Sequence, residues 1–292
     1  GTVELTSHAR HCKKVPVPSN GINSYLISPE SMNQFFRKFQ PDKYKRSVFV
    51  LSTHKCGTSL MNQAVFRKIK GLKQVDYDTT VYRNPNFLEP VTFKGRGHLY
   101  GIFRIGGSKK IFETRVSTTV QKPLKESGFL ETNPLILLVR DPRDVLVSFY
   151  YSVKYSHVAP PDPEEAKKFL ERRKSFENID IDDWVLQKSK SVNQALINID
   201  YLSSASKNKV LLKYEDLIEN YNIFWELLNR YLPLNNKIRE DLFQQSRPNK
   251  TENILAHKRS GAIGGYRHKL RAHTISKLES QLKESMNIFK YS

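Results

Sequence analysis

Three short apolar runs, separated by longer amphipathic stretches, stand out in the hydrophobic pattern of the chain. They occupy residues 47–51, 134–139 and 209–214. A continuous apolar run of this length, bounded by turn or charged residues, is typical of a parallel strand that is covered on both faces. The pattern therefore predicts three buried strands.

Helical periodicity follows each of these runs, over 58–70, 142–155 and 221–231. The second helix has a strong start signal, because Asp141 can cap it and Pro142 suits the first helical position. A polar stretch over 162–204 predicts further helices that cover the sheet. Alternation of strands and helices predicts an α/β fold, a single domain with a central parallel sheet flanked by helices on both faces. We assign residues 47–292 to this domain and residues 1–46 to an N-terminal extension that packs on its core.

The composition shows a strongly basic protein with enough apolar residues for a core. Its 292 residues include 48 Lys and Arg against 29 Asp and Glu, a net charge of +19, and 38% of them are hydrophobic. A wholly disordered basic tail is excluded, since such a chain could not offset its conformational entropy. No stretch reaches the ~18–20 apolar residues that cross a bilayer, and no signal peptide is evident. The charge indicates an anionic partner: nucleic acid, an acidic membrane surface, or a phosphorylated or sulfated small molecule.

The two cysteines, Cys12 and Cys56, are too few for a disulfide framework or a four-thiolate metal site. No cluster of His, Cys and carboxylate residues suggests a metal site either. A reducing compartment is therefore expected, with the cytoplasm as the default.

The first segment that carries chemistry is the turn after the first predicted strand. Lys55 and Gly57 lie in this turn, and Thr58 and Ser59 begin the following helix. A turn of this kind points backbone N–H groups at one spot, and lysine adds a full charge, so the segment favours an anion site. It resembles a nucleotide P-loop but departs from it, because the lysine precedes the glycine and the first glycine is missing. Taken alone, a generic strand-to-helix turn is an equal interpretation.

A second segment begins with Arg140, where the second predicted strand ends. The carboxyl edge of a parallel sheet is where open α/β folds bind ligands. Ser148 follows two helical turns beyond the Asp141 cap, so an arginine and a hydroxyl can reach a common anion. The guanidinium fork suits a phosphate. The alternative is that Arg140 and Arg143 simply pair with neighbouring aspartates.

A third segment, near the end of the chain, is rich in glycine and cations. It contains Arg259, Ser260 and Gly261 and continues to Lys269. Glycines flanked by cations suit a loop that wraps a phosphate, although basic glycine loops are also common on surfaces.

In this order, from about residue 47 to about residue 269, the three segments resemble the PAPS-dependent sulfotransferases, where PAPS is 3′-phosphoadenosine 5′-phosphosulfate. The resemblance implies that Lys55 is the catalytic lysine, that Arg140 and Ser148 bind the 3′-phosphate, and that Tyr214 lies near the adenine. Tyr266 stands where many relatives have tryptophan. The cofactor-binding residues that the resemblance implies are Lys55, Cys56, Gly57, Thr58, Ser59, Arg140, Ser148, Tyr214, Arg259, Ser260 and Gly261.

The reaction implied is in-line transfer of a sulfuryl group from PAPS to an acceptor hydroxyl, with release of 3′,5′-ADP and no requirement for a metal. The general base is where the chain departs from the family. Cytosolic relatives often carry Lys-Thr-His before the strand that corresponds to residues 134–139. The nearest match here is Glu113-Thr114-Arg115, which has no histidine. Glu113 and His98 are the candidate catalytic bases, each with a non-catalytic alternative. We interpret His54, beside Lys55, as a residue that shapes the loop.

Two other functions stay open at this stage. A P-loop-like kinase of a nucleotide or sugar would bind ATP with magnesium, whereas a sulfotransferase would bind 3′,5′-ADP without metal. A basic nucleic-acid-binding module would show steeply salt-dependent binding, but the common sequence signatures of such modules are missing, so no nucleic acid partner is expected.

The acceptor is open: a small alcohol, a phenol, a lipid or a carbohydrate all fit. The three cations that the resemblance places at the cofactor, Lys55, Arg140 and Arg259, account for only a small part of the net charge of +19. A solvated surface is one interpretation of that excess, and a polyanionic acceptor is the other. The compartment would be the Golgi lumen if a membrane anchor precedes Gly1.

Overall fold

The computed structural model describes much of the chain beyond residue 45. The residues described are 46–84, 87, 91–107, 119–120, 122–156, 158–159, 163–249, 251–253 and 260–292. Nearly all of the predicted N-terminal extension lies outside them, so the boundary at residue 46 stays a prediction.

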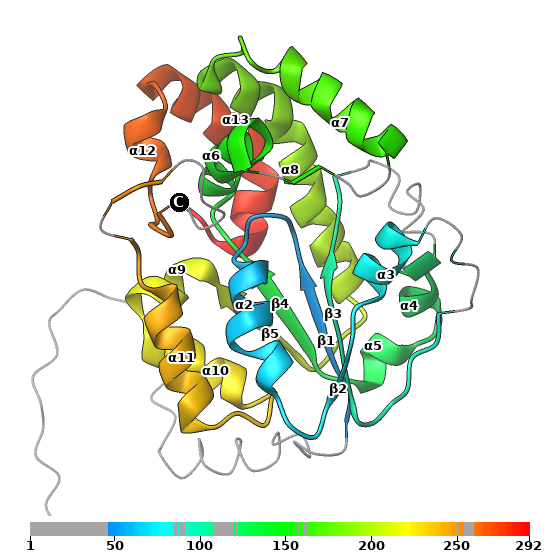
Figure 1. Ribbon diagram of the computed structural model, residues 1–292. Coiled ribbons are helices and arrows are strands. Elements are labelled where there is room, and N and C mark those ends of the chain that lie inside the picture. The colour runs from blue at the N-terminus through cyan, green and yellow to red at the C-terminus, as the bar shows by residue number, and fades with distance from the viewer. Residues whose placement is uncertain are drawn as a thin grey trace, which may run out of the picture. The chain divides into compact units, whose positions relative to one another are not determined.

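Five parallel strands form one sheet in the order β2-β3-β1-β4-β5 (Figure 1). Their bounds are β1 Val48–Ser52, β2 Lys73–Val75, β3 His98–Arg104, β4 Leu135–Val139 and β5 Lys209–Lys213. The three strands predicted from apolar runs are confirmed as β1, β4 and β5. The other two escaped prediction for physical reasons. β2 has only three residues, and β3 is interrupted by Gly101 and ends in an arginine.

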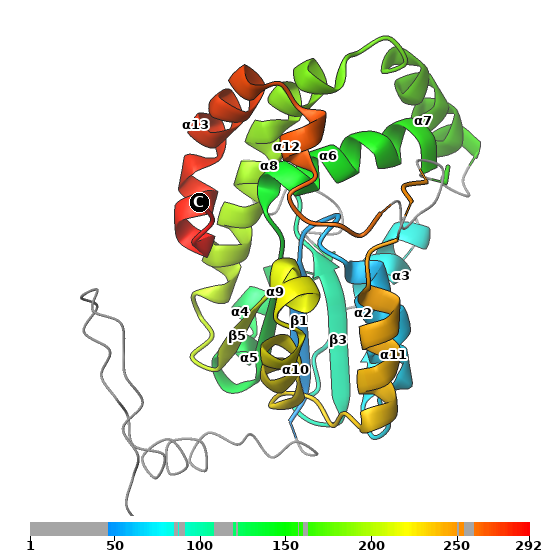
Figure 2. The same cartoon turned by 90° about the vertical axis from the view of Figure 1, so that its left-hand side faces the viewer.

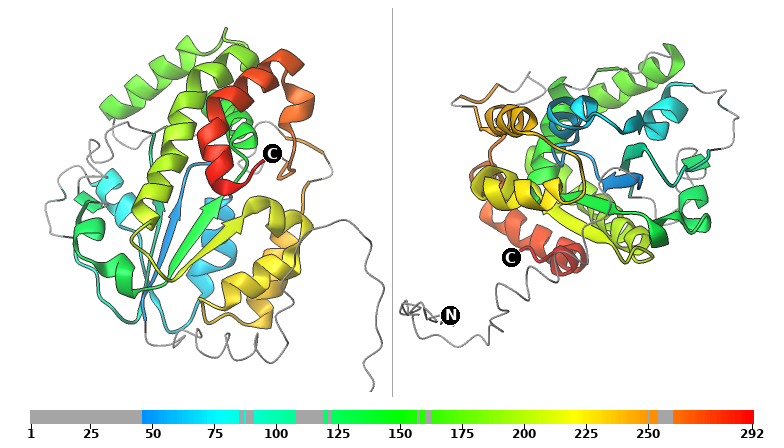
Figure 3. Two further views of the ribbon diagram at one scale, coloured as in Figure 1. Left: turned by 180° about the vertical axis from the view of Figure 1, so that it is seen from behind. Right: turned by 90° about the horizontal axis from the view of Figure 1, so that it is seen from below.

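The three apolar runs are continuous because both faces of the sheet are covered. Along β1, Val48 and Val50 belong to one buried hydrophobic cluster, and Phe49 and Leu51 belong to another. Successive side chains of a strand point to opposite faces, so each face has its own apolar layer. Seen from behind, α8 and α13 lie in front of the sheet and α2 lies behind it (Figure 3). This arrangement confirms the predicted α/β class with a central parallel sheet flanked by helices.

The helices follow the predicted pattern but several are shorter. The predicted helix 58–70 ends at Ala64, and a 3₁₀ turn, Phe66–Lys68, follows it. The predicted helix 142–155 ends at Tyr151 and continues as a π-helical turn, Ser152–Ser156. The helices are α2 Thr58–Ala64, α3 Tyr77–Arg83, α4 Lys122–Glu126, α5 Phe129–Thr132, α6 Pro142–Tyr151, α7 Pro163–Ser175, α8 Ile181–Ser203, α9 Tyr214–Glu219, α10 Tyr221–Asn229, α11 Asn236–Ser246, α12 Tyr266–Lys269 and α13 Ala272–Phe289.

Local signals explain where α6 begins. The Asp141 side chain accepts a hydrogen bond from Arg143 N at 2.9 Å, and Pro142 occupies the first helical position, as predicted. On the other side of the sheet from α8, α11 lies beside α2 (Figure 2). None of the helices that the structure describes is both long and apolar enough to cross a membrane.

The strand order decides which loops meet. β1 lies between β3 and β4, so the chain segments that leave the carboxyl ends of these three strands emerge side by side. Thr53 begins the loop after β1, Arg104 is the last residue of β3, and Arg140 directly follows β4. Tyr214 directly follows β5 at the same edge of the sheet. In an open α/β sheet this edge, where the strand order reverses, is where ligands bind.

Candidate active site

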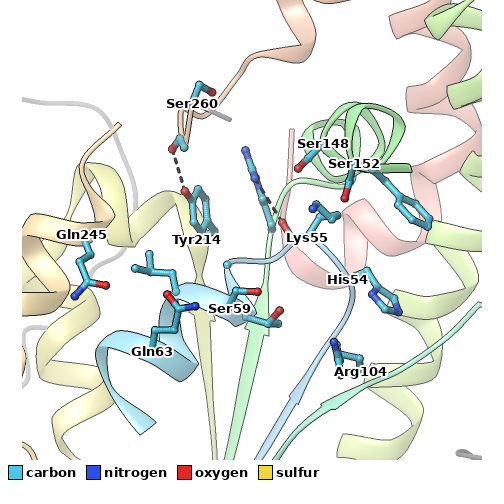
Figure 4. Close-up of a pocket in the computed structure, with 16 residues that line it drawn as sticks. His54, Lys55, Ser59, Gln63, Arg104, Ser148, Ser152, Tyr214, Gln245 and Ser260 are labelled. Carbon is cyan, nitrogen blue, oxygen red and sulfur yellow. Dashed lines mark hydrogen bonds between the residues drawn. The ribbon is translucent and has the colours of Figure 1, made fainter. Parts of the chain in front are cut away.

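A pocket of about 400 Å³ lies at this carboxyl edge (Figure 4). It brings together parts of all three predicted segments. These are the loop after β1 (residues 53–57, the β1 loop), Arg140 with Ser148 of α6, and the loop over residues 260–265 (the late loop). The predicted binding residues that line it are Lys55, Gly57, Thr58, Ser59, Arg140, Ser148, Tyr214, Ser260 and Gly261. Arg259 and Glu113 lie outside the described residues. Segments that are some 200 positions apart in the sequence therefore share one cavity.

The β1 loop has the backbone of an anion-binding turn. Lys55 has φ of 68° and Gly57 has φ of 78°, while Cys56 between them is not left-handed. This alternation turns successive backbone N–H groups toward one side. A left-handed conformation is costly for lysine, and such strain is found mostly at functional sites.

Gly57 is required for a second reason, which is space. A Cβ placed on Gly57 would lie 2.8 Å from Cδ2 of Tyr214, closer than carbon atoms approach in folded proteins. The glycine thus lets the loop and the tyrosine ring pack against each other. The space that a side chain at position 57 would need is occupied by the ring of Tyr214, which directly follows β5.

The Cys56 side chain turns away from the pocket and packs inside the loop. Its side chain is 0% exposed, and Sγ lies 3.1 Å from the Thr53 hydroxyl oxygen. Burial raises the pKa of the Cys56 thiol, although the Thr53 hydrogen bond and Arg140 oppose the rise. The thiol is therefore neutral and points into the core. Among the residues that the structure describes, no His, Cys, Asp and Glu side chains gather into a metal-binding group.

Arg140 is the buried cation of the pocket, with 7% of its surface exposed. Its guanidinium lies 4.4 Å from the centre of the Tyr214 ring and donates to the Ala262 carbonyl at 2.8 Å. Burial by itself would lower the pKa of Arg140, but the carboxylate of Asp144 and its other neighbours outweigh burial and raise the pKa. The side chain is thus held in its charged form. Its Nε, also buried, has no hydrogen-bond partner.

The alternative interpretation of the arginines is correct for Arg143. It donates to Asp141 at 2.8 Å and to Glu279 of α13 at 2.7 Å, so it joins α6 to the C-terminal helix. Arg140 also forms an ion pair, with Asp144 at 3.5 Å, but unlike Arg143 it lines the pocket. The two arginines of the second segment therefore have different tasks.

Asp144 and Tyr214 attach the late loop to the rest of the pocket. The Asp144 carboxylate accepts from the backbone N–H groups of Gly264, at 2.7 Å, and Tyr266, at 3.1 Å. The Tyr214 hydroxyl donates to the Gly261 carbonyl at 2.9 Å. These bonds place Ser260 and Gly261 at the pocket, next to Arg140.

His98 does not lie at the pocket. It is the first residue of β3, whereas the pocket residue Arg104 is the last, and six residues of strand separate their Cα atoms by about 20 Å. His98 Nδ1 lies 2.7 Å from the Arg96 carbonyl oxygen at the opposite edge of the sheet. The position of the strand, which the sequence pattern did not reveal, thus argues against His98 as the base.

Several residues that line the pocket were not assigned there from the sequence, and His54 and Arg104 are the two with a basic side chain. His54 lines the cavity, and its ring stacks on Phe149 with 6.1 Å between centroids and 5° between planes. Arg104 lines it from the end of β3. Figure 4 shows both on one side of the cavity, with Gln63 and Gln245 on the other. The adjacency of His54 to Lys55 was the available signal, whereas Arg104 had none because β3 was not predicted.

Comparison with known proteins gives the family. A family model described as the sulfotransferase domain matches residues 45–290. Mouse sulfotransferase SULT7A1 complexed with PAP is a similar solved structure, with 14% identity, coverage of 89% of this chain and 90% of that chain, and a TM-score of 0.46. Retinol dehydratase in a complex with retinol and PAP is another, with 15% identity, coverage of 87% and 86%, and a TM-score of 0.43. No curated protein matches the chain. Since the family model spans nearly all of the described domain and the predicted motifs meet in one pocket, the chain belongs to the PAPS-dependent sulfotransferase family.

Proposed function

We propose that this pocket binds PAPS and that the protein transfers its sulfuryl group to a hydroxyl of an acceptor, releasing 3′,5′-ADP. The observation that carries the proposal is the single cavity shared by the β1 loop, by Arg140 with Ser148, and by the late loop at Ser260. PAPS carries two anionic groups, so a site for it needs two sets of donors around one cavity.

The residues present fit such a group. The left-handed turn at Lys55 and Gly57 supplies backbone N–H groups and an ammonium for one anion. The buried, charged Arg140 has an unpartnered Nε, and Ser148 lines the same cavity from α6, which suits a second anion. Tyr214 offers an aromatic ring between these two places. We assign the loop to the 5′-phosphosulfate, Arg140 and Ser148 to the 3′-phosphate, and Tyr214 to the adenine side.

Each of these groups has a definite chemical task. PAPS, when bound, supplies the sulfuryl group and a phosphate leaving group. The Lys55 ammonium would stabilise negative charge on the leaving oxygen, and it would do so more strongly as that charge grows. Thr58 and Ser59 would hold phosphate oxygens through their hydroxyls. Because these donors are held in place before the reaction, little reorganisation is needed when charge develops.

For the general base we propose His54. It lines the pocket next to Lys55, and its imidazole ring lies parallel to the ring of Phe149. A neutral imidazole in this place can accept the proton of an acceptor hydroxyl. Glu113, outside the described residues, stays the alternative. The acceptor itself is proposed only as a hydroxyl compound: an alcohol, a phenol, a lipid or a carbohydrate.

A calorimetric titration with 3′,5′-ADP in the absence of metal tests the cofactor site. We expect saturable binding by the wild type and by Lys55→Ala, whereas transfer from PAPS falls in the variant by at least about a hundredfold, the effect of removing one transition-state donor. Lys277→Ala, which removes an exposed lysine from α13, is the matched control and should keep full activity. Absence of nucleotide binding, or magnesium-dependent binding of ATP instead, would overturn the proposal.

A second pair of variants tests the base. His54→Gln should lower kcat by about 10²–10⁴-fold while 3′,5′-ADP still binds, because only the proton acceptor is lost. Glu113→Gln is the comparison. If Glu113→Gln shows the large loss and His54→Gln does not, the base is Glu113.

A further inference from the structure

A second cavity, of about 260 Å³, adjoins the pocket described above. It lies between α2, α3 and the carboxyl end of β3. Thr58, Ser59, Gln63 and Arg104 line both cavities, so the two meet at the start of α2 and at the end of β3. A molecule in the second cavity would therefore lie next to the loop that we assign to the phosphosulfate.

Positive charge dominates the lining of this second cavity. Three guanidinium groups, those of Arg67, Arg83 and Arg104, stand against one carboxylate, that of Asp76. The carboxylate is already used, because it caps α3 by accepting from Thr79 N at 3.0 Å and from the Thr79 hydroxyl at 2.7 Å. These partners are neutral, so Asp76 keeps its charge, and the lining still has two positive charges in excess.

Two of the arginines are available to a ligand. Arg67 and Arg83 are both exposed, and among the residues that the structure describes neither has a hydrogen bond or an ion pair. Within the described part of the chain, the Arg104 guanidinium donates a single long hydrogen bond, 3.4 Å, to the Thr79 hydroxyl. Guanidinium groups that converge on a small cavity repel one another unless an anion joins them, and their paired N–H groups match the oxygens of a carboxylate or a sulfate.

Apart from Ile102, the remaining lining is polar and suits hydroxyl groups. Asn62 and Gln63 bring side-chain amides, and Thr58, Ser59 and Thr79 bring hydroxyls. Asn62 is held in place by a hydrogen bond of 2.6 Å from Gln74 Nε2 to its Oδ1. A volume of about 260 Å³ lies just below the range of ~300–1,000 Å³ that holds a whole small molecule. It is therefore suited to the reacting unit of a larger acceptor.

We propose that the second cavity is the acceptor subsite and that it selects a sugar unit carrying a carboxylate or a sulfate. This inference rests on the proposed function, since it names the acceptor of the same reaction. Arg67 and Arg83 bind the anionic group, the amides bind sugar hydroxyls, and the hydroxyl to be modified faces the Lys55 loop across Thr58 and Ser59.

The cavity is a poor match for the donor instead. The first pocket already has its own buried cation, Arg140, for a phosphate and its own turn for the phosphosulfate. The surplus of basic residues in the chain is also far larger than one nucleotide needs. Both observations favour an anionic acceptor, and the experiment separates the two.

The test compares probes that share one scaffold. All three probes are p-nitrophenyl glycosides that differ only at carbon 6 of the sugar. The β-glucoside has a neutral hydroxymethyl group there, the β-glucuronide has a carboxylate, and the β-glucoside 6-sulfate has a sulfate ester. We expect transfer from PAPS with kcat/KM at least about tenfold higher for both charged probes, a difference typical of one hydrogen bond to a charged group. Calorimetric binding of each probe in the presence of 3′,5′-ADP should follow the same order. A preference for one charged probe over the other tells carboxylate from sulfate.

Variants then assign the preference to the cavity. Arg67→Gln and Arg83→Gln should each raise KM for the charged probes about tenfold, and leave KM for the neutral probe and for PAPS unchanged. Both side chains are exposed, so the fold should persist. Lys277→Gln removes the same charge from α13 and should change none of these values.

Two results would overturn the inference. Equal kcat/KM for charged and neutral probes would show that the cavity does not select an anion. A rise in KM for PAPS alone in Arg67→Gln and Arg83→Gln would show that the arginines serve the donor. In both cases 3′,5′-ADP still binds, whereas loss of that binding in the wild type would mean that the proposed function itself has failed.

Discussion

A buried carboxylate beside the site gives the protein a pH-dependent stability that can be measured directly. Asp78 lies on α3 with 4% of its surface exposed. Its Oδ2 accepts a hydrogen bond from Arg104 N at 2.6 Å, and its Oδ1 is buried without a partner. Burial raises the pKa of Asp78 from 3.8 to about 7, although the hydrogen bond from Arg104 opposes the rise.

The size and sign of the effect follow from this pKa. A rise of roughly three units corresponds to about 4 kcal/mol between the folded and unfolded states. Between about pH 4 and pH 7 the unfolded chain has already lost the proton that the folded protein keeps. Stability is therefore fully present below about pH 4 and decreases by about 1.4 kcal/mol per unit until pH 7, above which the loss is constant.

Asp78→Asn removes this titration while keeping an oxygen for Arg104 N. The variant should match the wild type near pH 4 and be more stable by up to about 4 kcal/mol at pH 8. Urea unfolding at several values between about pH 4.5 and pH 8 measures the difference. Asp200→Asn, at an exposed position of α8, is the control and should show no such trend. A difference that stays constant across the range would refute the reasoning, because only a titrating Asp78 makes it grow.

Two further predictions concern the β1 loop. Gly57→Ala places a Cβ 2.8 Å from the Tyr214 ring, at a residue whose φ is 78°. The variant should therefore be less stable by about 1–3 kcal/mol and bind 3′,5′-ADP at least about tenfold more weakly. Unchanged affinity for 3′,5′-ADP would mean that the loop can adopt a different backbone conformation. The Cys56 thiol is buried and has a raised pKa, so it should resist a chromogenic thiol reagent in the native protein and react only after unfolding. The absorbance of the released chromophore gives the number of thiols that have reacted. Rapid modification of both cysteines without unfolding would contradict its burial.

The strands that could be predicted from sequence are those with a single environment along their whole length. β1, β4 and β5 have apolar side chains that pack against helices on both faces, so a continuous apolar run reports them. β3 carries a histidine, a glycine and an arginine among its apolar residues, which breaks the run. Its place in the sheet comes from pairing with β1 and β2, which are distant in the sequence.

The chemistry of the pocket divides in the same way. The sequence indicated a turn at Lys55 and Gly57 that favours an anion, and the structure adds the left-handed backbone of both residues. Arg140 was ambiguous, since a sequence does not tell which aspartate an arginine meets. The structure resolves this through distances: Arg143 pairs with Asp141, whereas Arg140 pairs with Asp144 and also lies against Tyr214 in the pocket.

The sequence by itself determined the α/β class, the turn at Lys55 and Gly57 and the order of the motifs, because local backbone preference and the burial of whole strands are encoded in short segments. Only the tertiary structure decided which side chains share the cavity. Insertion of β1 between β3 and β4 puts Arg104 beside the loop and leaves His98 at the far end of its strand. The same fold packs α3 on β3 and gathers Arg67, Arg83 and Arg104 around the second cavity, because contacts between segments distant in the chain depend on the fold rather than on any local pattern.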